Sequence, residues 1–379
     1  MFELIVGGNM RLAAYNLENL FDRAKAMNLD SWEEGKPILA AFAKLNSLLG
    51  ESTYSAANKR KMVELMIELG LEKSDKGPFV ILRRNHGGLV KRPRAGGLEI
   101  IADGRADWVG SLELLDEPVD ENAMRNTARV LAELEADVVG VIEAENRPAL
   151  NEFNRIMIPA VGGAAFRHVM VIDGNDERGI DVGLLCREGF AIETMRSHVD
   201  DRMANGVEVF SRDCPEYHLT TPNGNRLIVM VNHFKSKGYG TVAGSNARRK
   251  AQAQRVKEIY EGLIAQGAQF IAVAGDLNDT PDSDPLAPLI GDTTLQDAFT
   301  HSRFDNGGYP GTYDSCSEAK KIDYLLLSPQ FFAKVSAGGV IRKGMWPGVR
   351  PKKWDVYEEL ADKRDAASDH AAVWVDVDI

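Results

Sequence analysis

Cysteine is scarce in this sequence. The 379 residues include only Cys186, Cys214 and Cys316, an odd number at wide spacing. No histidines accompany them at the spacing of a metal site, so we expect reduced structural thiols in a reducing compartment. A single disulfide is the alternative.

Long apolar runs are missing as well. No run reaches the roughly 18 to 20 residues that a helix needs to span a bilayer, so we expect no membrane span. The segment Met1–Met10 has no basic region and only a short apolar patch, which is unlike a signal peptide. We therefore expect a cytoplasmic protein, and secretion with a signal removed beforehand is the alternative.

The chain also has no surplus of positive charge. Its formal net charge is −11, which argues against a surface that coats nucleic acid throughout, although local basic patches can still bind phosphate. The charged and hydrophobic fractions, 27% and 44%, are ordinary for a globular protein. A chain of this length can bury a large core, in one big sandwich or in two or three domains.

Short apolar runs bounded by turn residues predict many strands. They cover residues 11–16, 137–142, 167–172, 182–186, 217–221, 227–232, 270–274, 322–327 and 371–377. Helical spacing predicts helices over 121–135 and 245–266 and after Pro148. Strands with helices between them favour a two-sheet α/β sandwich with the helices outside.

The segment from about 23 to 115 breaks this rhythm. It has helix and strand patterns of its own, at 38–49, 59–69, 79–82 and 108–114. We interpret it as an insertion in a single domain that spans residues 1–379.

One strand stands out because of the polar residues at its end. The buried run from Phe270 to Ala274 stops at Gly275-Asp276-Leu-Asn278, so a carboxylate and an amide lie at a strand end. A rigid sheet can fix polar groups there that would be costly to bury inside it. A capping Asp followed by an Asn in a turn is the structural alternative.

Other predicted strands also end at, or begin from, acidic, amide or imidazole groups. These groups are Asn16, Glu143, His233, Asp323, Asp369 and His370. Each one alone is more often a turn residue or a structural histidine. Together they form a set of hard oxygen ligands that suits Mg²⁺ or Mn²⁺, whereas zinc prefers more histidine and thiolate.

Six motifs occur in the order seen in the endonuclease/exonuclease/phosphatase superfamily, which the chain resembles from Arg11 to Val377, outside most of the insertion. The motifs are Tyr15-Asn16-Leu-Glu-Asn, Ile142-Glu143-Ala-Glu-Asn, Asn232-His233-Phe-Lys, Gly275-Asp276-Leu-Asn278, Ile322-Asp323-Tyr-Leu-Leu and Ser368-Asp369-His370. Three more pieces resemble a bacterial nuclease-like branch of that superfamily: Asn19-Leu-Phe-Asp22, Glu143-Ala-Glu-Asn-Arg-Pro148 and Arg178-Gly-Ile-Asp-Val-Gly-Leu-Leu185.

The resemblance implies a deoxyribonuclease-I-like fold, a four-layered α/β sandwich of two packed mixed sheets between helices. It also implies hydrolysis of phosphate esters with Mg²⁺ or Mn²⁺. Glu143 would be the principal metal ligand, with Asn16 and Asp369 beside the metal. Asp276 would orient or deprotonate the attacking water, and Asn278 would hold a non-bridging phosphate oxygen.

Two histidines complete the implied site. His370 would donate a hydrogen bond or a proton to the phosphoryl centre, Asp323 would fix its ring, and His233 would be the second imidazole on the phosphate. Physical chemistry supports these residue types independently. An anionic phosphodiester repels nucleophiles, so a metal must offset the negative charge of the phosphate while a carboxylate orients or deprotonates the attacking water. An Asp beside an imidazole orients the ring and favours its charged form.

Three further residues have both a functional and a structural interpretation. The guanidinium group of Arg178 could donate hydrogen bonds to a phosphate oxygen, and Asp181 could orient His233. Alternatively, both residues belong to a surface loop. Lys235 could contact phosphate or remain solvated. Glu145 is interpreted as a supporting or structural residue.

The leading functional hypothesis is a nuclease that cleaves DNA or RNA with little sequence specificity. Basic stretches at 83–94, 235–250 and 342–353 motivate it, because cationic loops can hold a phosphate backbone without reading bases. Trp346 and Trp354 could stack on unpaired bases. Solvated basic residues and core tryptophans are the structural alternative.

Two other functions remain open. A phosphatase or phosphodiesterase that acts on a small phosphorylated molecule or a lipid headgroup fits the acidic balance, and the insertion could then form a lid. A non-catalytic binding module is less compatible with the intact motif set. Cleavage of DNA or of RNA, within a strand or from its ends, and with one metal or with two, is compatible with the motif set.

Overall fold

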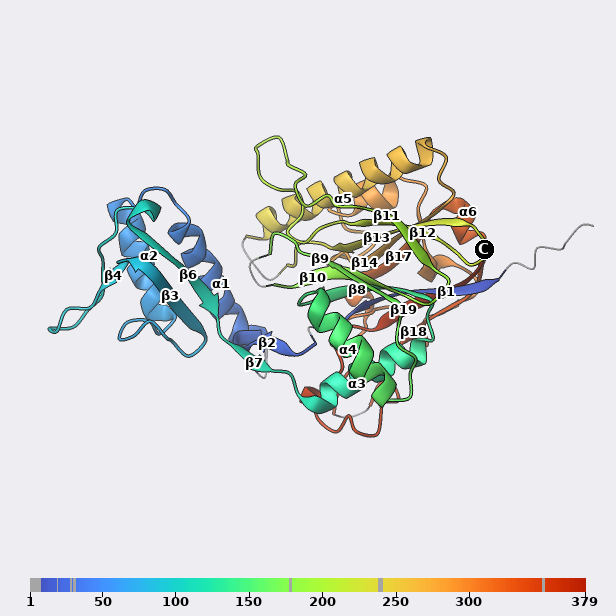
Figure 1. Ribbon diagram of the computed structural model, residues 1–379, viewed down its shortest axis with the longest axis horizontal. Helices are drawn as coiled ribbons and strands as arrows, with labels where there is room; N and C mark the ends of the chain where they lie inside the picture. The colour runs from blue at the N-terminus through green and yellow to red at the C-terminus, as the bar shows by residue number, and fades with distance from the viewer. Residues whose placement is uncertain are drawn as a thin grey trace, which may run out of the picture. The chain divides into compact units, whose positions relative to one another are not determined.

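The computed structural model (Figure 1) describes residues 8–18, 20–27, 29, 32–176, 179–237, 241–349 and 352–379. These residues form two compact units. The first combines the described part of Met1–Phe21 with Val119–Lys237 and Val242–Ile379, and the second is formed mainly by Asp22–Pro118. The segment interpreted as an insertion, 23–115, lies within the second unit.

Two mixed β-sheets form the centre of the first unit. Among the described residues, the β1 sheet has the strand order β16 (Phe304–Asp305), β18 (Val335–Ile341), β19 (Ala372–Asp378), β1 (Asn9–Asn16), β8 (Val138–Ala144), β10 (Asp181–Cys186) and β9 (His168–Ile172). The β14 sheet has the order β11 (Ala191–Arg196), β12 (Glu216–Thr220), β13 (Arg226–His233), β14 (Phe270–Asp276), β17 (Asp323–Leu327) and β15 (Gln296–Asp297).

The apolar inner faces of the two sheets pack against each other. This inner core includes Leu12, Val138, Val231, Ala274 and Val375, all of them almost wholly buried. On the outer face of the β1 sheet lie α3 (Glu121–Leu134) and α4 (Arg147–Ala160), and on the outer face of the β14 sheet lies α5 (Val242–Ala265) (Figure 1). The first unit is therefore a four-layered α/β sandwich, which confirms the predicted fold.

Capping residues set where two of these helices begin. The Asp120 side chain accepts the N–H of Asn122 at the start of α3. The Asn146 side chain accepts the N–H of Ala149 at the start of α4, and Pro148 follows in the first turn. Shorter helical segments are α6 (Pro329–Phe332), η3 (Ala287–Gly291), η4 (Ala298–Thr300), η5 (Glu318–Lys320) and η6 (Lys363–Asp365).

The second unit has a hydrophobic core of its own. It contains α1 (Trp32–Leu49), α2 (Ala56–Glu68), the paired strands β3 (Val80–Gly87) and β6 (Trp108–Leu114), the pair β4 (Val90–Lys91) and β5 (Glu99–Ile100), the pair β2 (Asp22–Ala24) and β7 (Asp116–Pro118), and the turns η1 (Lys25–Met27) and η2 (Arg105–Asp107). Leu45, Met62, Leu65 and Trp108 belong to its core. The Trp108 indole donates to the hydroxyl of Tyr54 at 2.9 Å.

Most of the predicted elements are present within a few residues of their expected bounds, but two longer strands were missed. β11 is exposed over most of its length, so it lacks an apolar alternation, and β18 contains Gly338 and Gly339, which weaken a strand pattern. All three cysteines are buried and free, as predicted. In the part of the chain that is described, no helix is both long and apolar enough to cross a membrane.

Candidate active site

The register of the β14 sheet brings three predicted site residues together. β13 runs parallel to β14 with His233 opposite Asp276, and β17 runs antiparallel to β14 with Asp323 opposite Asp276. The three residues are at most 4% exposed. They end β13 and β14 and begin β17, so they gather at one end of the sheet.

A glycine permits the close approach of these strands. A Cβ atom at Gly275 would lie 2.0 Å from the carbonyl oxygen of Asn232, and Gly275 has a φ of 128°, which residues with side chains rarely adopt. The Gly-Asp-Xaa-Asn motif therefore needs its glycine where β13 and β14 converge, directly before Asp276.

A β-bulge sets Glu143 apart in the β1 sheet. Val182 pairs with Ile142 and Asp181 pairs with Ala144, which leaves Glu143 as an extra residue of β8. Its φ is 61°, in the left-handed region that non-glycine residues seldom occupy. Bulges and strained backbone of this kind occur beside active sites because they re-aim a side chain.

Asn16, Asp369 and His370 also come from the β1 sheet. Asn16 ends β1 and is aligned with Ile142 of the parallel strand β8. Asp369 and His370 precede β19, the antiparallel neighbour of β1. Glu18 links the two segments: its N–H donates to Asn16 Oδ1 at 3.0 Å, and its carboxylate accepts the N–H of Asp369 at 3.0 Å.

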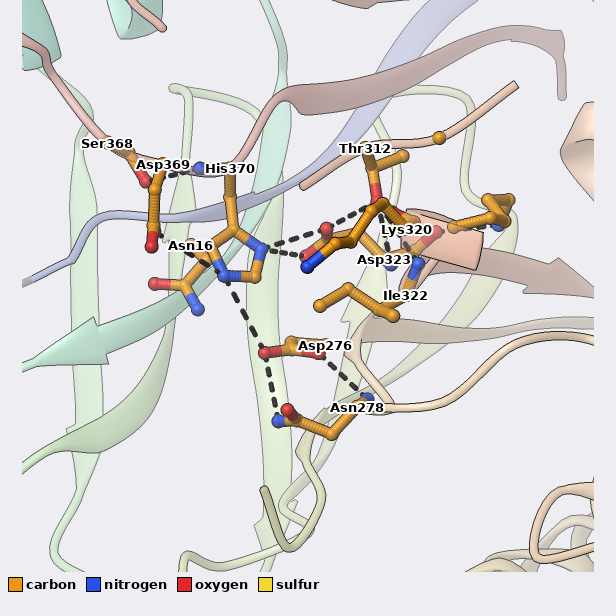
Figure 2. A network of polar contacts seen from close by, with 12 residues as sticks. Asn16, Asp276, Asn278, Thr312, Lys320, Ile322, Asp323, Ser368, Asp369 and His370 are labelled. Carbon is orange, nitrogen blue, oxygen red and sulfur yellow. Dashed lines mark hydrogen bonds and ion pairs between the residues drawn. The ribbon is translucent and has the colours of Figure 1, made fainter. Parts of the chain in front are cut away.

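The groups from the two sheets form an alternating row of carboxylates and imidazoles. His233 Nε2 lies 3.6 Å from Glu143 Oε1 and 3.6 Å from Asp276 Oδ2. His370 Nε2 lies 3.9 Å from Asp276 Oδ2 and 3.6 Å from Asp369 Oδ1 (Figure 2). Three acids thus alternate with two histidines, and Asp276 is at the centre.

Asp323 holds the ring of His370. The Nδ1 atom lies 3.0 and 2.9 Å from the two carboxylate oxygens, and the ring of Tyr313 is 4.8 Å away between centroids. Burial by itself lowers the pKa of His370, but the charge and hydrogen bond of Asp323 and the charges of Asp369 and Asp276 raise it well above its usual value. We therefore expect a cationic ring at neutral pH, anchored through Nδ1.

Asn278 holds Asp276. The backbone N–H and the side-chain amide of Asn278 donate to the two oxygens of Asp276 at 2.8 and 3.0 Å, and the amide also donates to the Phe234 carbonyl at 3.1 Å. Burial raises the pKa of Asp276 to about 8; the charge of His370 opposes the rise and nearby carboxylates add to it. A carboxyl group that titrates near neutral pH is suited to accept a proton from water.

The acidic groups are suited to a hard divalent cation. Glu143, Asp276, Asp323 and Asp369 outnumber the two imidazoles, so an anionic phosphate would be repelled unless a cation entered with it. Ligand atoms of Asp276, Asp323 and His370 lie within 4.8 Å of one another and could hold a metal. However, Asp323 and His370 are bonded to each other, which leaves this group less available than the Glu143 side of the site.

One buried amide of the site has an unused hydrogen-bond donor. Asn16 is wholly buried, and its Nδ2 atom has no hydrogen-bond partner among the described residues. Buried polar atoms of this kind usually have a partner, and because the amide nitrogen donates, the missing partner is an acceptor such as water or a phosphate oxygen. The carboxylates that the resemblance places with Asn16 at the metal belong to Glu143 and Asp369, and they are of the type that Mg²⁺ or Mn²⁺ prefers.

Comparisons with known proteins agree with this fold. A model described as Endonuclease/Exonuclease/phosphatase family matches residues 112–299. A mannosyl-6-phosphatase from Bacteroides thetaiotaomicron has a similar structure, with a TM-score of 0.50 and 18% identity, over 67% of this chain and 90% of that one. The family model and the similar structure confirm the predicted resemblance to the endonuclease/exonuclease/phosphatase superfamily.

Superfamily members typically hydrolyse phosphoester bonds and commonly use divalent metals. Another family member from Bacteroides thetaiotaomicron has a TM-score of 0.49 and 17% identity, over 68% of this chain and 89% of that one. The catalytic domain of human Nocturnin has a TM-score of 0.46 and 14% identity, over 69% and 87%. Comparison with curated protein sequences found no significant match.

Arg178 and Asp181 have different outcomes. Arg178 lies outside the described residues. Asp181 is buried and accepts the N–H of Gly174 at 2.9 Å, and no hydrogen bond of the described chain joins it to His233. Burial raises the pKa of Asp181 to about 7. The expected support of His233 by Asp181 therefore stays a prediction.

α5 holds the loop that carries Lys235. The Lys235 N–H donates to Gln252 Oε1 at 2.8 Å, and the Lys235 carbonyl accepts from Arg249 at 2.8 Å. Arg249 is buried and pairs with Asp279 at 3.0 Å. The backbone two residues beyond His233 is thus fixed. Arg249, one cation of the basic stretch 235–250, is buried in an ion pair inside the protein.

The basic stretch 342–353 is less available than its sequence indicates. Arg342 is 6% exposed and donates to the carbonyls of Asn306, Tyr309 and Gly311. Its charge is committed to holding these loops, so we remove Arg342 from the residues expected to contact nucleic acid.

In the second unit, arginines of the stretch 83–94 are paired with acids. Arg83 pairs with Glu113, and Arg84 and Arg92 both pair with Asp75. The positive charge that remains for a phosphate backbone is therefore smaller than the count of basic residues indicates.

Sequence reasoning did not single out Thr312 and left Glu145 without a defined contact. The hydroxyl of Thr312 is bonded to Asp323 at 2.6 Å, and the carboxylate of Glu145 accepts the N–H groups of Leu20 and Phe21 at 2.7 and 2.8 Å. Thr312 lies outside any strand, so a search for polar residues at the ends of predicted strands could not find it. Glu145 lies only two residues beyond Glu143, which was its one sequence signal.

Proposed function

We propose that this protein is a divalent-metal-dependent phosphodiester hydrolase, with the DNA or RNA backbone as its first candidate substrate. The observation that carries the proposal is the alternating row Glu143, His233, Asp276, His370 and Asp369, with contacts of 3.6 to 3.9 Å between neighbours. The row combines oxygen ligands for a cation, an acid that titrates near neutral pH, and two imidazoles.

Glu143 would hold Mg²⁺ or Mn²⁺, with Asn16 and Asp369 beside it. A bound cation offsets the charge of the phosphate so that a nucleophile can approach. Asp276 is held by Asn278, and Asp323, which lies outside the row, is bonded to His370. These partners favour Glu143 over Asp276 and Asp323 as the carboxylate that holds the cation.

Asp276 would orient the attacking water and accept its proton. Asn278 fixes both oxygens of this carboxyl group, and its amide protons point to Asp276 and the Phe234 carbonyl. We therefore propose that Asn278 mainly positions Asp276. Holding a non-bridging phosphate oxygen, the role that the superfamily resemblance implies, would require Asn278 to give up one of these bonds.

His370 would act on the phosphoryl group through Nε2. Its Nδ1 is bonded to Asp323, and Nε2 faces Asp276 and Asp369, so Nε2 is the atom nearest the centre of the row. His233 would be the second imidazole, between Glu143 and Asp276. General acid–base assistance of this kind contributes roughly 10² to 10⁴-fold to the rate.

The pairing of the basic residues favours a second candidate, a phosphatase or phosphodiesterase for a small phosphorylated molecule. Arg342 is buried, and Arg83, Arg84, Arg92 and Arg249 are paired with acids. A small phosphate ester needs cations only at its own phosphate, whereas a nucleic acid needs an extended cationic surface. The structural neighbour that is a mannosyl-6-phosphatase has the same fold.

One assay separates the two candidates. Plasmid DNA, single-stranded DNA, RNA, bis(p-nitrophenyl) phosphate and a panel of sugar phosphates would be incubated with Mg²⁺, Mn²⁺ or EDTA, with the Asp276→Ala variant as control. We expect metal-dependent hydrolysis that EDTA and the substitution abolish. Cleavage of nucleic acid should fall steeply with added salt. A flat salt response would count against the nuclease, and hydrolysis of none of these esters by wild type would refute the proposed function.

A further inference from the structure

The Thr312 hydroxyl contacts the Asp323–His370 pair from within the protein. Thr312 is fully buried, and its Oγ1 lies 2.6 Å from Asp323 Oδ2 (Figure 2). The same oxygen lies 3.0 Å from the backbone nitrogen of Asp323 and 3.2 Å from that of Ile322. A fourth neighbour, the Lys320 carbonyl, is 3.5 Å away.

These partners determine the direction of each hydrogen bond. A hydroxyl has one proton to donate and two lone pairs to accept with. The N–H groups of Ile322 and Asp323 can only donate, so they occupy both lone pairs of Thr312. The proton goes to an acceptor, and Asp323 Oδ2 at 2.6 Å is much closer than the Lys320 carbonyl at 3.5 Å.

The consequence reaches His370. Because Thr312 donates to Asp323 Oδ2, that oxygen is an acceptor, which favours an ionised Asp323 that also accepts from Nδ1 of the His370 ring. The backbone of Thr312 supports the other partner as well, since its carbonyl accepts the N–H of Ala371, next to His370, at 2.7 Å. One residue thus holds both members of the pair.

We propose that Thr312 is a positioning residue for the reaction: it keeps Asp323 an acceptor and thereby holds the His370 ring with Nδ1 toward Asp323 and Nε2 toward Asp276. This inference rests on the proposed function for its kinetic consequence, but its structural part stands independently of any substrate.

The kinetic test uses Thr312→Val, which removes the hydroxyl at nearly constant shape, and Thr312→Ser, which keeps it. We expect Val to lower kcat about 10 to 100-fold with KM within about threefold, and Ser to restore kcat to within about threefold of wild type. In the Asp323→Ala background, Thr312→Val should lower kcat by less than about twofold more, because the group it acts through is gone. Equal losses in both backgrounds, or wild-type kcat in Thr312→Val, would overturn the inference.

Imidazole ¹⁵N spectra of histidine-labelled protein test the structural part without turnover, at a temperature where circular dichroism shows each variant folded. We expect Nδ1 of His370 to be protonated in wild type and Thr312→Ser, with its proton exchanging faster in Thr312→Val. An unprotonated Nδ1 in wild type, or no change in exchange in Thr312→Val, contradicts the inference. A wild-type protein that shows the expected spectra but hydrolyses no phosphoester would refute the proposed function and leave the hydrogen-bond assignment correct.

Discussion

A buried carboxylate shared by two histidines leads to a stability prediction outside the candidate active site. Glu216, at the start of β12, is 1% exposed, with Oε1 2.7 Å from His198 Nε2 and Oε2 2.9 Å from His218 Nε2. The other ring nitrogen of His198 lies 2.9 Å from Asp201, which also accepts from Arg255 at 2.7 Å. The perturbation is Glu216→Gln.

The size of the effect is set by the pKa of Glu216. Burial raises this pKa, but the hydrogen bonds and charges of His198 and His218 outweigh burial and lower it from 4.5 to about 2. At about 1.36 kcal/mol per pH unit, the ionised group stabilises the fold by about 3 kcal/mol. The pKa of His198 is raised despite burial, by its bonds to Glu216 and Asp201, so the two pKa values largely describe one interaction and are not added.

The sign of the pH dependence is definite. A carboxyl group whose pKa is lower in the folded state stabilises the protein above its unfolded pKa, and this contribution is lost as the pH falls through about 4.5 toward 2. We therefore expect Glu216→Gln to lower the free energy of unfolding by about 2 to 4 kcal/mol at pH 7 and by less as the pH approaches 3.

Thermal unfolding followed by far-UV circular dichroism at several pH values measures this difference. The exposed Glu193 on β11 offers a matched control, and Glu193→Gln should stay within about 0.5 kcal/mol of wild type. If Glu216→Gln melts like wild type at pH 7, or if the difference grows as the pH falls below about 4.5, the reasoning about this network is refuted.

Three other predictions concern the site and the domain organisation. His370→Ala should lower kcat by about 10² to 10⁴-fold with an unchanged circular dichroism spectrum, and wild-type turnover would contradict its proposed role. Glu143→Gln should weaken Mn²⁺ binding by at least about tenfold in titration calorimetry, and unchanged affinity would exclude it as the principal ligand. Phe21 accepts the N–H of Val119 at 2.8 Å, so replacement of residues 22–118 by a short turn should leave the first unit folded. A molten spectrum for that deletion variant would contradict the division into two units.

The sequence alone determined the layout of the fold and which strand ends carry reactive groups. Apolar runs such as Phe270 to Ala274 are local, and a buried strand must be apolar wherever it pairs, so the pattern is visible without knowing the neighbours. The order of the six motifs then placed Asn16, Glu143 and Asp276 in one candidate site before any contact was known.

Other features of the site depended on strand pairing. The bulge at Glu143 exists only because β10 pairs with Ile142 and Ala144. The residues of β8 alone do not predict it. The contact of Thr312 with Asp323 joins a loop to a strand through a hydroxyl, which has no periodic signal in the sequence.

The basic residues show most clearly what the sequence determined and what the tertiary structure decided. The sequence determined how many basic residues each stretch contains, and on that basis 342–353 was expected to be available to a phosphate backbone. Only the tertiary structure decided that Arg342 is buried against the carbonyls of Asn306, Tyr309 and Gly311. A charge is a property of the residue, but whether it faces water or a buried carbonyl depends on segments far away in the chain.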